Sequence, residues 1–407
     1  MDQPSPPAAL PAQPFFSTPQ QRLALARQRF FDEGVRPSGL VNESVIQSWS
    51  RCLQERRDPR ERIAFNPVTA SRIHSALARS RLLLDAAATN LDQLEQTLAG
   101  TSCTAILTDP HGVVVHATRS APQHGELLLP LARRVGVNLD EAHVGTNAPG
   151  ISLRTGQPCL VMGGEHFFGP LHTLHCAAAP IRDVHGRIAA VLDLTSEGRP
   201  FGFDAGAVVA LYATTIENQL LRAQSREHLV VQLQATPALL GTPMEGLAGL
   251  DASGRIAWLN NVAARLLGVA QGDTGLAVDT VFGVGANRLA QWTRATGPTP
   301  HRLPSGLNVW IVARMQGRDG GSASVALPMS TAPRASPAAA QVSLPAAASM
   351  EEAPSAAVPA PPPATLRAHD RDLIVQMLQA CGGNVSQAAR KLGVSRGLVY
   401  RHLRQAT

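Results

Sequence analysis

The sequence contains only one lysine, Lys391, among its 36 lysine and arginine residues. A nucleotide-binding phosphate loop of the form G-x-x-x-x-G-K-[ST] needs a lysine that reaches the β- and γ-phosphates. Lys391 follows Arg390 rather than glycine and precedes Leu392 rather than serine or threonine. The chain therefore lacks a nucleotide-hydrolysing motor of the phosphate-loop class.

Paired cysteines and long apolar runs are also missing. The five cysteines show no C-x-x-C spacing and are odd in number: Cys52, Cys103, Cys159, Cys176 and Cys381. This pattern predicts reduced thiols in a cytoplasmic protein. The proline-rich first residues lack the basic start and apolar run of a signal peptide, and no apolar run is long enough to span a membrane. We therefore expect a cytoplasmic protein with no membrane partner.

His172, His175 and Cys176 lie close enough in sequence to suggest a metal site. His175 and Cys176 fall in a predicted strand, and neighbouring residues of a strand point to opposite faces. That geometry argues against a shared ion. We expect neither a metal nor a cofactor.

The carboxyl end, residues 383–404, has the pattern of a helix-turn-helix. Asn384 and Gln387 have the spacing of a capping box at the start of one helix, and Gly393 ends that helix. Ser395 caps the next helix, whose Val399 and Leu403 share an apolar face. The opposite face of that helix is polar and basic, with Arg396, Gly397, Tyr400, Arg401 and Arg404.

A helix with arginines on its exposed face fits the major groove of double-stranded DNA, where guanidinium groups reach guanine edges or phosphates. Residues 366–407 hold seven arginines and lysines against two aspartates, and so carry +5 of the formal net charge of +6. The alternative is a surface helix whose arginines are only solvated. The agreement of caps, turn and charge favours DNA binding.

These residues resemble the DNA-binding end of the Fis family, shared by bacterial enhancer-binding regulators. The resemblance covers 366–407 and implies an all-α domain that dimerises through its first helix. It implies that Ser386 contacts a backbone phosphate, and that Ser395, Arg396 and Arg401 contact bases or phosphates. Leu398 departs from the small hydroxyl residue usual at its position.

The first 330 residues predict an α+β protein. We expect a disordered segment over 1–20, a helical segment over 21–69 and one long helix over 70–98. Strands with turns at Pro110–Gly112 and Asp183–Gly186 predict an antiparallel sheet. A helix is expected from Asp204 to Gln234.

Several motifs in this half resemble the amino-terminal half of acetoin-catabolism-type activators, whose sensor is a GAF domain. They are residues 48–52, 144–150, 164–167, 176–181 and 191–195. The resemblance implies a GAF domain with flanking helices over 70–234, an antiparallel sheet that binds a small-molecule effector. Small or polar residues in this apolar block are the candidate ligand contacts: Gly145, Thr146, Asn147, Glu165, His166 and Cys176. The alternative is that they serve turns and local pairing.

Residues 235–330 look like a PAS domain: 246–251, 254–260 and a helix over 261–267 resemble its opening, and strands near 307–315 and 322–329 would finish it. Residues 331–365 contain 8 prolines and 13 alanines. Such a segment cannot bury enough surface to fold and should be a linker. The expected organisation is therefore a GAF sensor, a PAS-like domain, a linker and a helix-turn-helix over 366–407.

In the resembling activators, an ATPase module lies between the sensor and the DNA-binding end. Its absence predicts a regulator that is not an enzyme and works by occupying DNA or contacting a partner. A homodimer is expected because two half-sites give more specificity than one. RNA polymerase or a full-length relative with an AAA+ ATPase module remain open as partners. The alternatives are a thiol enzyme or redox sensor built on the GAF domain, and a nonspecific nucleoid protein.

Overall fold

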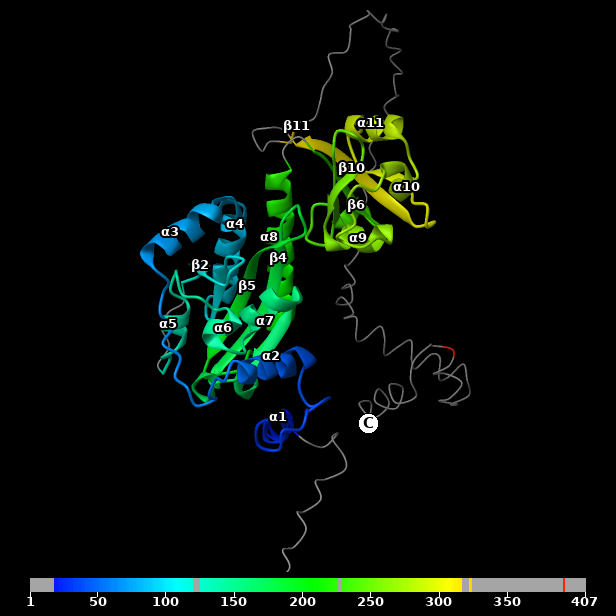
Figure 1. The fold of residues 1–407 in the computed structure, drawn as a ribbon. Coiled ribbons are helices and arrows are strands. Elements are labelled where there is room, and N and C mark those ends of the chain that lie inside the picture. The colour runs from blue at the N-terminus through cyan, green and yellow to red at the C-terminus, as the bar shows by residue number, and fades with distance from the viewer. Residues whose placement is uncertain (1–17, 120–124, 226–227, 317–321, 324–390, 392–407) are drawn as a thin grey trace, which may run out of the picture. The chain divides into compact units, whose positions relative to one another are not determined.

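The computed structural model describes residues 18–119, 125–225, 228–316, 322–323 and 391 (Figure 1). The chain divides into two compact units, 1–329 and 330–407, and both sheets of the described residues lie in the first unit. Within the described residues, no helix has the length and apolar character needed to cross a membrane. The predicted linker and helix-turn-helix lie outside the described residues apart from Lys391.

The first unit contains two antiparallel sheets flanked by helices, which confirms the predicted mixed α+β class. The first sheet has the order β2-β1-β5-β4-β3. Its strands are β1 (Cys103–Thr108), β2 (Val114–Ala117), β3 (Cys159–Met162), β4 (Leu174–Arg182) and β5 (Ile188–Glu197). Asp109 and Asp183 each accept backbone N–H groups in the tight turns expected from the sequence.

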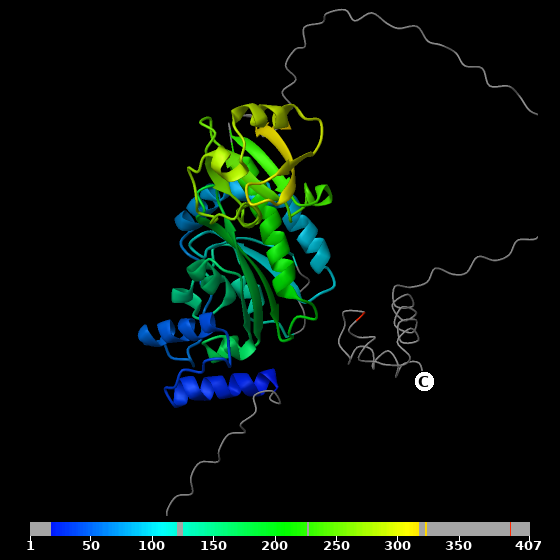
Figure 2. The same ribbon diagram turned by 90° about the vertical axis from the view of Figure 1, so that its right-hand side faces the viewer.

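Helices cover both faces of this sheet (Figures 1 and 2). Strand side chains alternate between the faces, so Ala105 and Leu107 pack on one side and Ile106 on the other. The first face carries α3 (Ala70–Arg79), α4 (Arg81–Leu98) and α8 (Ala205–Gln224). The single helix predicted over 70–98 is thus two helices with a break at Ser80, whose ψ of 3° departs from the helical value.

The second face of the sheet packs against the amino-terminal helices and a set of short elements. The amino-terminal elements are α1 (Pro19–Arg27), the π-helical turn η2 (Gln28–Asp32) and α2 (Glu43–Gln54). The short elements are α5 (Leu129–Ala132), α6 (Glu141–Val144), α7 (Ala148–Thr155), η3 (Gly163–Glu165) and η4 (Gly169–Leu171). Thr18 and Asn42 cap α1 and α2 with their side chains, which explains where these helices begin.

The helix predicted from Asp204 to Gln234 is wrong in its last part, because α8 ends at Gln224 and Leu229–Gln234 forms strand β6. Strand β6 lies between β10 and β7 and hydrogen-bonds to both. Its side chains are apolar on both faces: Val231 packs into one core cluster and Val230 into another. The predicted domain boundary at residue 234 must therefore move towards the amino end of β6.

The second sheet has the order β11-β10-β6-β7-β8, with β9 also paired to β10. Its further strands are β7 (Gly246–Leu250), β8 (Ile256–Leu259), β9 (Thr299–Arg302), β10 (Asn308–Gln316) and β11 (Ser322–Ala323). One face is covered by α9 (Asn261–Leu267), α10 (Val278–Phe282) and α11 (Ala286–Arg294), and η5 (Pro237–Leu239) follows β6. The helix predicted over 261–267 and the strand predicted near 307–315 are confirmed by α9 and β10, and 246–251 and 254–260 contain β7 and β8. Of the strand predicted over 322–329, only the first two residues are described.

Candidate sensor site and its relatives

The six candidate ligand residues of the first sheet lie on its second face or in the segments that cover it. Gly145, Thr146 and Asn147 join α6 to α7, Glu165 and His166 lie in and after η3, and Cys176 lies on β4. In the structure their polar groups mostly contact other parts of the protein. Many of these contacts come from the amino-terminal helices α1 and α2.

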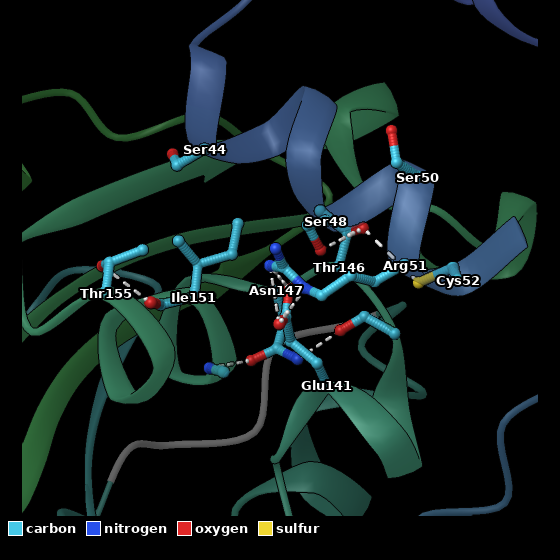
Figure 3. A network of polar contacts seen from close by, with 12 residues as sticks. Ser44, Ser48, Ser50, Arg51, Cys52, Glu141, Thr146, Asn147, Ile151 and Thr155 are labelled. Carbon is cyan, nitrogen blue, oxygen red and sulfur yellow. Dashed lines mark hydrogen bonds and ion pairs between the residues drawn. The ribbon is translucent and has the colours of Figure 1, made fainter. Parts of the chain in front are cut away.

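Helix α2 packs against the start of α7 through a buried hydroxyl pair (Figure 3). The Ser48 and Thr146 hydroxyl oxygens are 2.7 Å apart, and both residues are fully buried. The Cys52 sulfur lies 3.8 Å from the same Thr146 oxygen. Thr146 is therefore already engaged by α2.

An ion pair lies beside this contact. The Arg51 guanidinium donates from Nε and Nη2 to the Glu141 carboxylate at 3.0 and 2.8 Å. The two side chains are 23% and 10% exposed. A bidentate guanidinium–carboxylate contact fixes the relative orientation of the two side chains as well as their distance. The ion pair therefore fixes the position of α2 against α6.

The backbone around Glu165 and His166 accepts hydrogen bonds from side chains of the amino-terminal helices. Trp49 Nε1 donates to the Glu165 carbonyl oxygen at 2.7 Å. Arg27 Nη1 donates to the carbonyl oxygens of Gly164 and His166 at 2.9 and 3.0 Å. Motifs 48–52, 144–150 and 164–167 thus meet in one place, called here the α2–α7 interface.

Gly145 and Asn147 have local backbone roles. Gly145 has φ 69° and ψ −156°, a conformation open almost only to glycine. A Cβ there would lie 2.5 Å from Phe168. Asn147 caps α7 by accepting from the Gly150 N–H at 2.8 Å, and its amide donates to the Gly145 carbonyl oxygen.

Beneath these segments runs a chain of buried polar groups. His166 Nε2 lies 3.6 Å from the Cys176 sulfur, the Thr195 hydroxyl 3.3 Å from that sulfur, and Thr195 Oγ1 2.5 Å from Asp193 Oδ2. Burial raises the pKa of Asp193 to about 7 and lowers the pKa of His166 to about 4. Asp193 Oδ1 has no hydrogen-bond partner in the described part of the chain.

Asp193 and Thr195 were not among the candidate contacts predicted from the sequence. The sequence did hold one indication, because Asp193 is a carboxylate in the middle of the apolar run Val191–Thr195. A single polar residue in a strand, however, does not show which face of the sheet it occupies. Arg51 and Glu141 lie 90 residues apart, and only the fold brings them together.

The four described cysteines are free and buried. Burial raises the pKa of Cys52, Cys103 and Cys176, and raises the pKa of Cys159 to about 11. A thiol with a raised pKa is a poor nucleophile at neutral pH. Within the described ranges, no group of three or more His, Cys, Asp or Glu side chains is placed to hold a metal ion.

The predicted DNA-contacting residues all lie outside the described residues: Ser386, Ser395, Arg396, Gly397, Tyr400, Arg401 and Arg404. Comparison with known proteins bears on this part. Residues 365–405 match the bacterial regulatory protein family Fis, and residues 18–215 match the MimR N-terminal domain. The second match starts in α1 and ends within α8, so the helices of the α2–α7 interface belong to the same family domain as the first sheet.

The chain is 30% identical over 282 residues to the acetoin catabolism regulatory protein of Cupriavidus necator, an alignment covering 65% of this chain and 41% of that relative. It is 31% identical over 175 residues to MimR, the propane 2-monooxygenase operon transcriptional activator of Mycolicibacterium smegmatis, covering 43% and 29%. Over these residues the chain is similar to acetoin-type transcriptional regulators. Both relatives are named as regulators of transcription or catabolism.

The chain spans about 40% or less of the length of these regulators. Among solved structures, the crystal structure of the E. coli DhaR(N)–DhaL complex matches with a TM-score of 0.42 and 18% identity, covering 67% of this chain and 99% of that one.

Proposed function

We propose that the protein is a transcriptional regulator that binds double-stranded DNA through residues 366–407 and senses a small molecule through the domain of the first sheet. The observation that carries this proposal is that one chain combines a MimR-type N-terminal domain with a Fis-family helix-turn-helix. Its relatives in acetoin and propane metabolism are named as regulators.

The DNA contact is assigned to the second helix of the helix-turn-helix. Ser395, Arg396, Gly397, Tyr400, Arg401 and Arg404 would face the major groove, with Ser386 on a phosphate. Arginine forks suit guanine edges and phosphates, and the positive charge of this segment favours approach to DNA. Two copies binding two half-sites would give the specificity that one helix lacks.

The finer fold assignments, a GAF domain for the first sheet and a PAS-like domain for the second, belong to this proposal. The effector would bind on the second face of the first sheet. There Cys176, His166 and Asp193 place polar groups among apolar side chains, a composition typical of small-molecule sites. Gly145, Thr146, Asn147 and Glu165 would support that site by holding the segments that cover it.

Without a nucleotide-hydrolysing module in this sequence, regulation would arise from binding energies alone. The bound effector would change the affinity for DNA, for RNA polymerase or for a full-length AAA+ relative. The size of this change is limited by the difference between the affinities of the effector for the two conformations of the regulator. A homodimer is the expected form.

Chromatin pulled down with the tagged protein identifies the operator, and gel shifts on that operator test the contacts. Arg396→Ala and Arg401→Ala should each weaken operator binding by about 1–3 kcal/mol if the side chain reads a base. Arg265→Ala, on the exposed side of α9, is the control and should bind normally. Unchanged binding by the Arg396/Arg401 double variant contradicts the assignment, and equal affinity for random DNA at the same salt indicates a nonspecific nucleoid protein instead.

A further inference from the structure

A groove of about 760 Å³ lies where α4 and α8 meet the second sheet. It is separate from the proposed sensor site, because α4 and α8 cover the opposite face of the first sheet from Cys176 and Thr146. Its principal polar lining comes from Asp85, Asn90 and Gln93 of α4, Gln219 and Arg222 of α8, and Arg314 of β10. The volume is in the range of small-molecule sites.

Asn90 is the side chain that marks this groove as more than a surface depression. The residue is only 7% exposed, and it lines the groove. Its side-chain amide has no hydrogen-bond partner anywhere in the described part of the chain, although an amide can donate two hydrogen bonds and accept two. The Asn90 amide atoms are not among the enclosed polar atoms that lack a partner, so the amide is open to the groove and available to a ligand there.

The groups around Asn90 indicate which kind of ligand could form hydrogen bonds with its amide. Gln93 and Gln219 add two further amides with no side-chain hydrogen bond among the described residues. The Arg222 guanidinium is paired with Glu245. Arg314 is exposed and forms no ion pair within the described ranges, so it is the cation free to meet an anion. The groove therefore offers one buried amide at Asn90, exposed amides at Gln93 and Gln219, and two exposed charges, the Arg314 guanidinium and the Asp85 carboxylate.

We propose that this groove binds a small hydroxylated carboxylic acid. Its carboxylate would contact Arg314, because a guanidinium fork matches the geometry of a carboxylate. Its hydroxyl groups would exchange hydrogen bonds with the amides of Asn90, Gln93 and Gln219. The ligand would contact α4 and α8 from the first domain and β10 from the second sheet, so it would bridge the two.

Isothermal titration calorimetry on the full chain without DNA tests the proposal. The probes are L-threonate, D-erythronate and L-malate, with erythritol as a neutral four-carbon control. At least one acid should bind and erythritol should not. Asn90→Leu and Arg314→Gln should each weaken binding at least tenfold, whereas Arg302→Gln, an exposed arginine of β9 outside the groove, should bind like the wild type. Failure of all three acids to bind, equal binding of erythritol, or full binding by both groove variants overturns the proposal.

Two further measurements test whether Asn90→Leu weakens ligand binding for a structural reason instead. Without ligand, its thermal midpoint should stay close to that of the wild type, because the change removes no side-chain hydrogen bond within the described residues. A lower midpoint means that the amide has a structural partner and counts against the proposal. Sedimentation should show the same oligomeric state for both proteins; a weaker self-association of the variant assigns the amide to a second copy and overturns the ligand site. Operator binding is not involved in any of these outcomes, so they are distinct from failure of the proposed DNA-binding function.

Discussion

Arg51 and Glu141 form a two-pronged ion pair that joins α2 to α6 across 90 residues of chain. Both residues belong to or adjoin motifs that make the sequence resemble acetoin-type activators. Beside them, Ser48 contacts Thr146 and Trp49 contacts the Glu165 carbonyl oxygen. The main role of these motifs is therefore to attach the amino-terminal helices to the domain of the first sheet. The proposed effector site lies between this attachment and the sheet.

The first prediction concerns this pair. Arg51→Met and Glu141→Gln should each lower the free energy of unfolding by about 2 kcal/mol, because each leaves a mostly buried charge without its partner. The double variant should lose less than the sum, giving a coupling energy of about 1 kcal/mol or more. Hydrogen exchange of α2 amides measures these free energies locally. The exposed residue Arg60 supplies the control, Arg60→Met, with no expected effect, and strict additivity of Arg51→Met and Glu141→Gln would show that the pair is not coupled.

Local signals were enough to predict much of the fold. The turns at Asp109 and Asp183 depend on side chains bonding to neighbouring backbone, which is chemistry readable from a few residues. The end of α8 could not be read in this way, because Val230 continues the apolar spacing of the helix although it lies in β6. Strand pairing on both sides decides that segment, and pairing with residues 246–250 and 308–316 is a tertiary effect that overrides local periodicity.

At the candidate site, too, local sequence patterns were not enough, because contacts between distant residues decide the structure. Gly145, Thr146 and Asn147 were recognised as special from their residue types, yet residue type alone did not decide between a turn and a ligand contact. In the structure Asn147 caps α7 locally, whereas Thr146 contacts Ser48 of α2, 98 residues away. Asn90 was invisible in the sequence, since a polar residue in an amphipathic helix normally faces water.

A second prediction tests how α1 is held. Arg27 places its guanidinium 4.6 Å from the Phe31 ring centre and donates to two carbonyl oxygens of the 164–167 segment. Arg27→Ala should cost about 2 kcal/mol, which raises the open fraction of α1 and η2 about 30-fold. Chymotrypsin cleavage after Phe30 or Phe31 should accelerate by a similar factor. Arg22→Ala, on the exposed side of α1, should be cleaved at the wild-type rate; equal rates for both variants would remove Arg27 from this role.

A third prediction separates backbone strain from ligand contact at Gly145. Gly145→Ala should lower the free energy of unfolding by about 3 kcal/mol or more, because the backbone conformation disfavours a side chain and the new methyl group would overlap Phe168. Gly186→Ala is the matched control: Gly186 has φ 71° with no atom within 4 Å of the added carbon, so about 1 kcal/mol is expected. Thermal or urea unfolding gives both values. Similar losses for both variants would mean that the contact with Phe168 relaxes without cost.

The last prediction uses the buried carboxyl of Asp193. The Thr195 hydroxyl has one proton and cannot donate to both Cys176 and Asp193, whereas a protonated Asp193 can donate to Thr195 while Thr195 donates to the sulfur. Burial raises the pKa of Asp193 from 3.8 to about 7. Between these values the folded state keeps a proton that the unfolded state releases, so the stability from this group is full below pH 3.8 and is lost as the pH rises to 7.

Asp193→Asn keeps the neutral shape and removes this titration. Relative to the wild type, the variant should gain about 2–3 kcal/mol of stability between pH 5 and pH 8, since two pKa units correspond to about 2.7 kcal/mol. Hydrogen exchange of β4 and β5 amides at the two pH values, corrected for intrinsic rates, gives the difference. Asp92→Asn, on the exposed side of α4, should follow the wild type at both pH values. A pH-independent difference for Asp193→Asn would mean that Asp193 titrates in its ordinary range and that the chain from His166 to Asp193 is organised around a charged carboxylate.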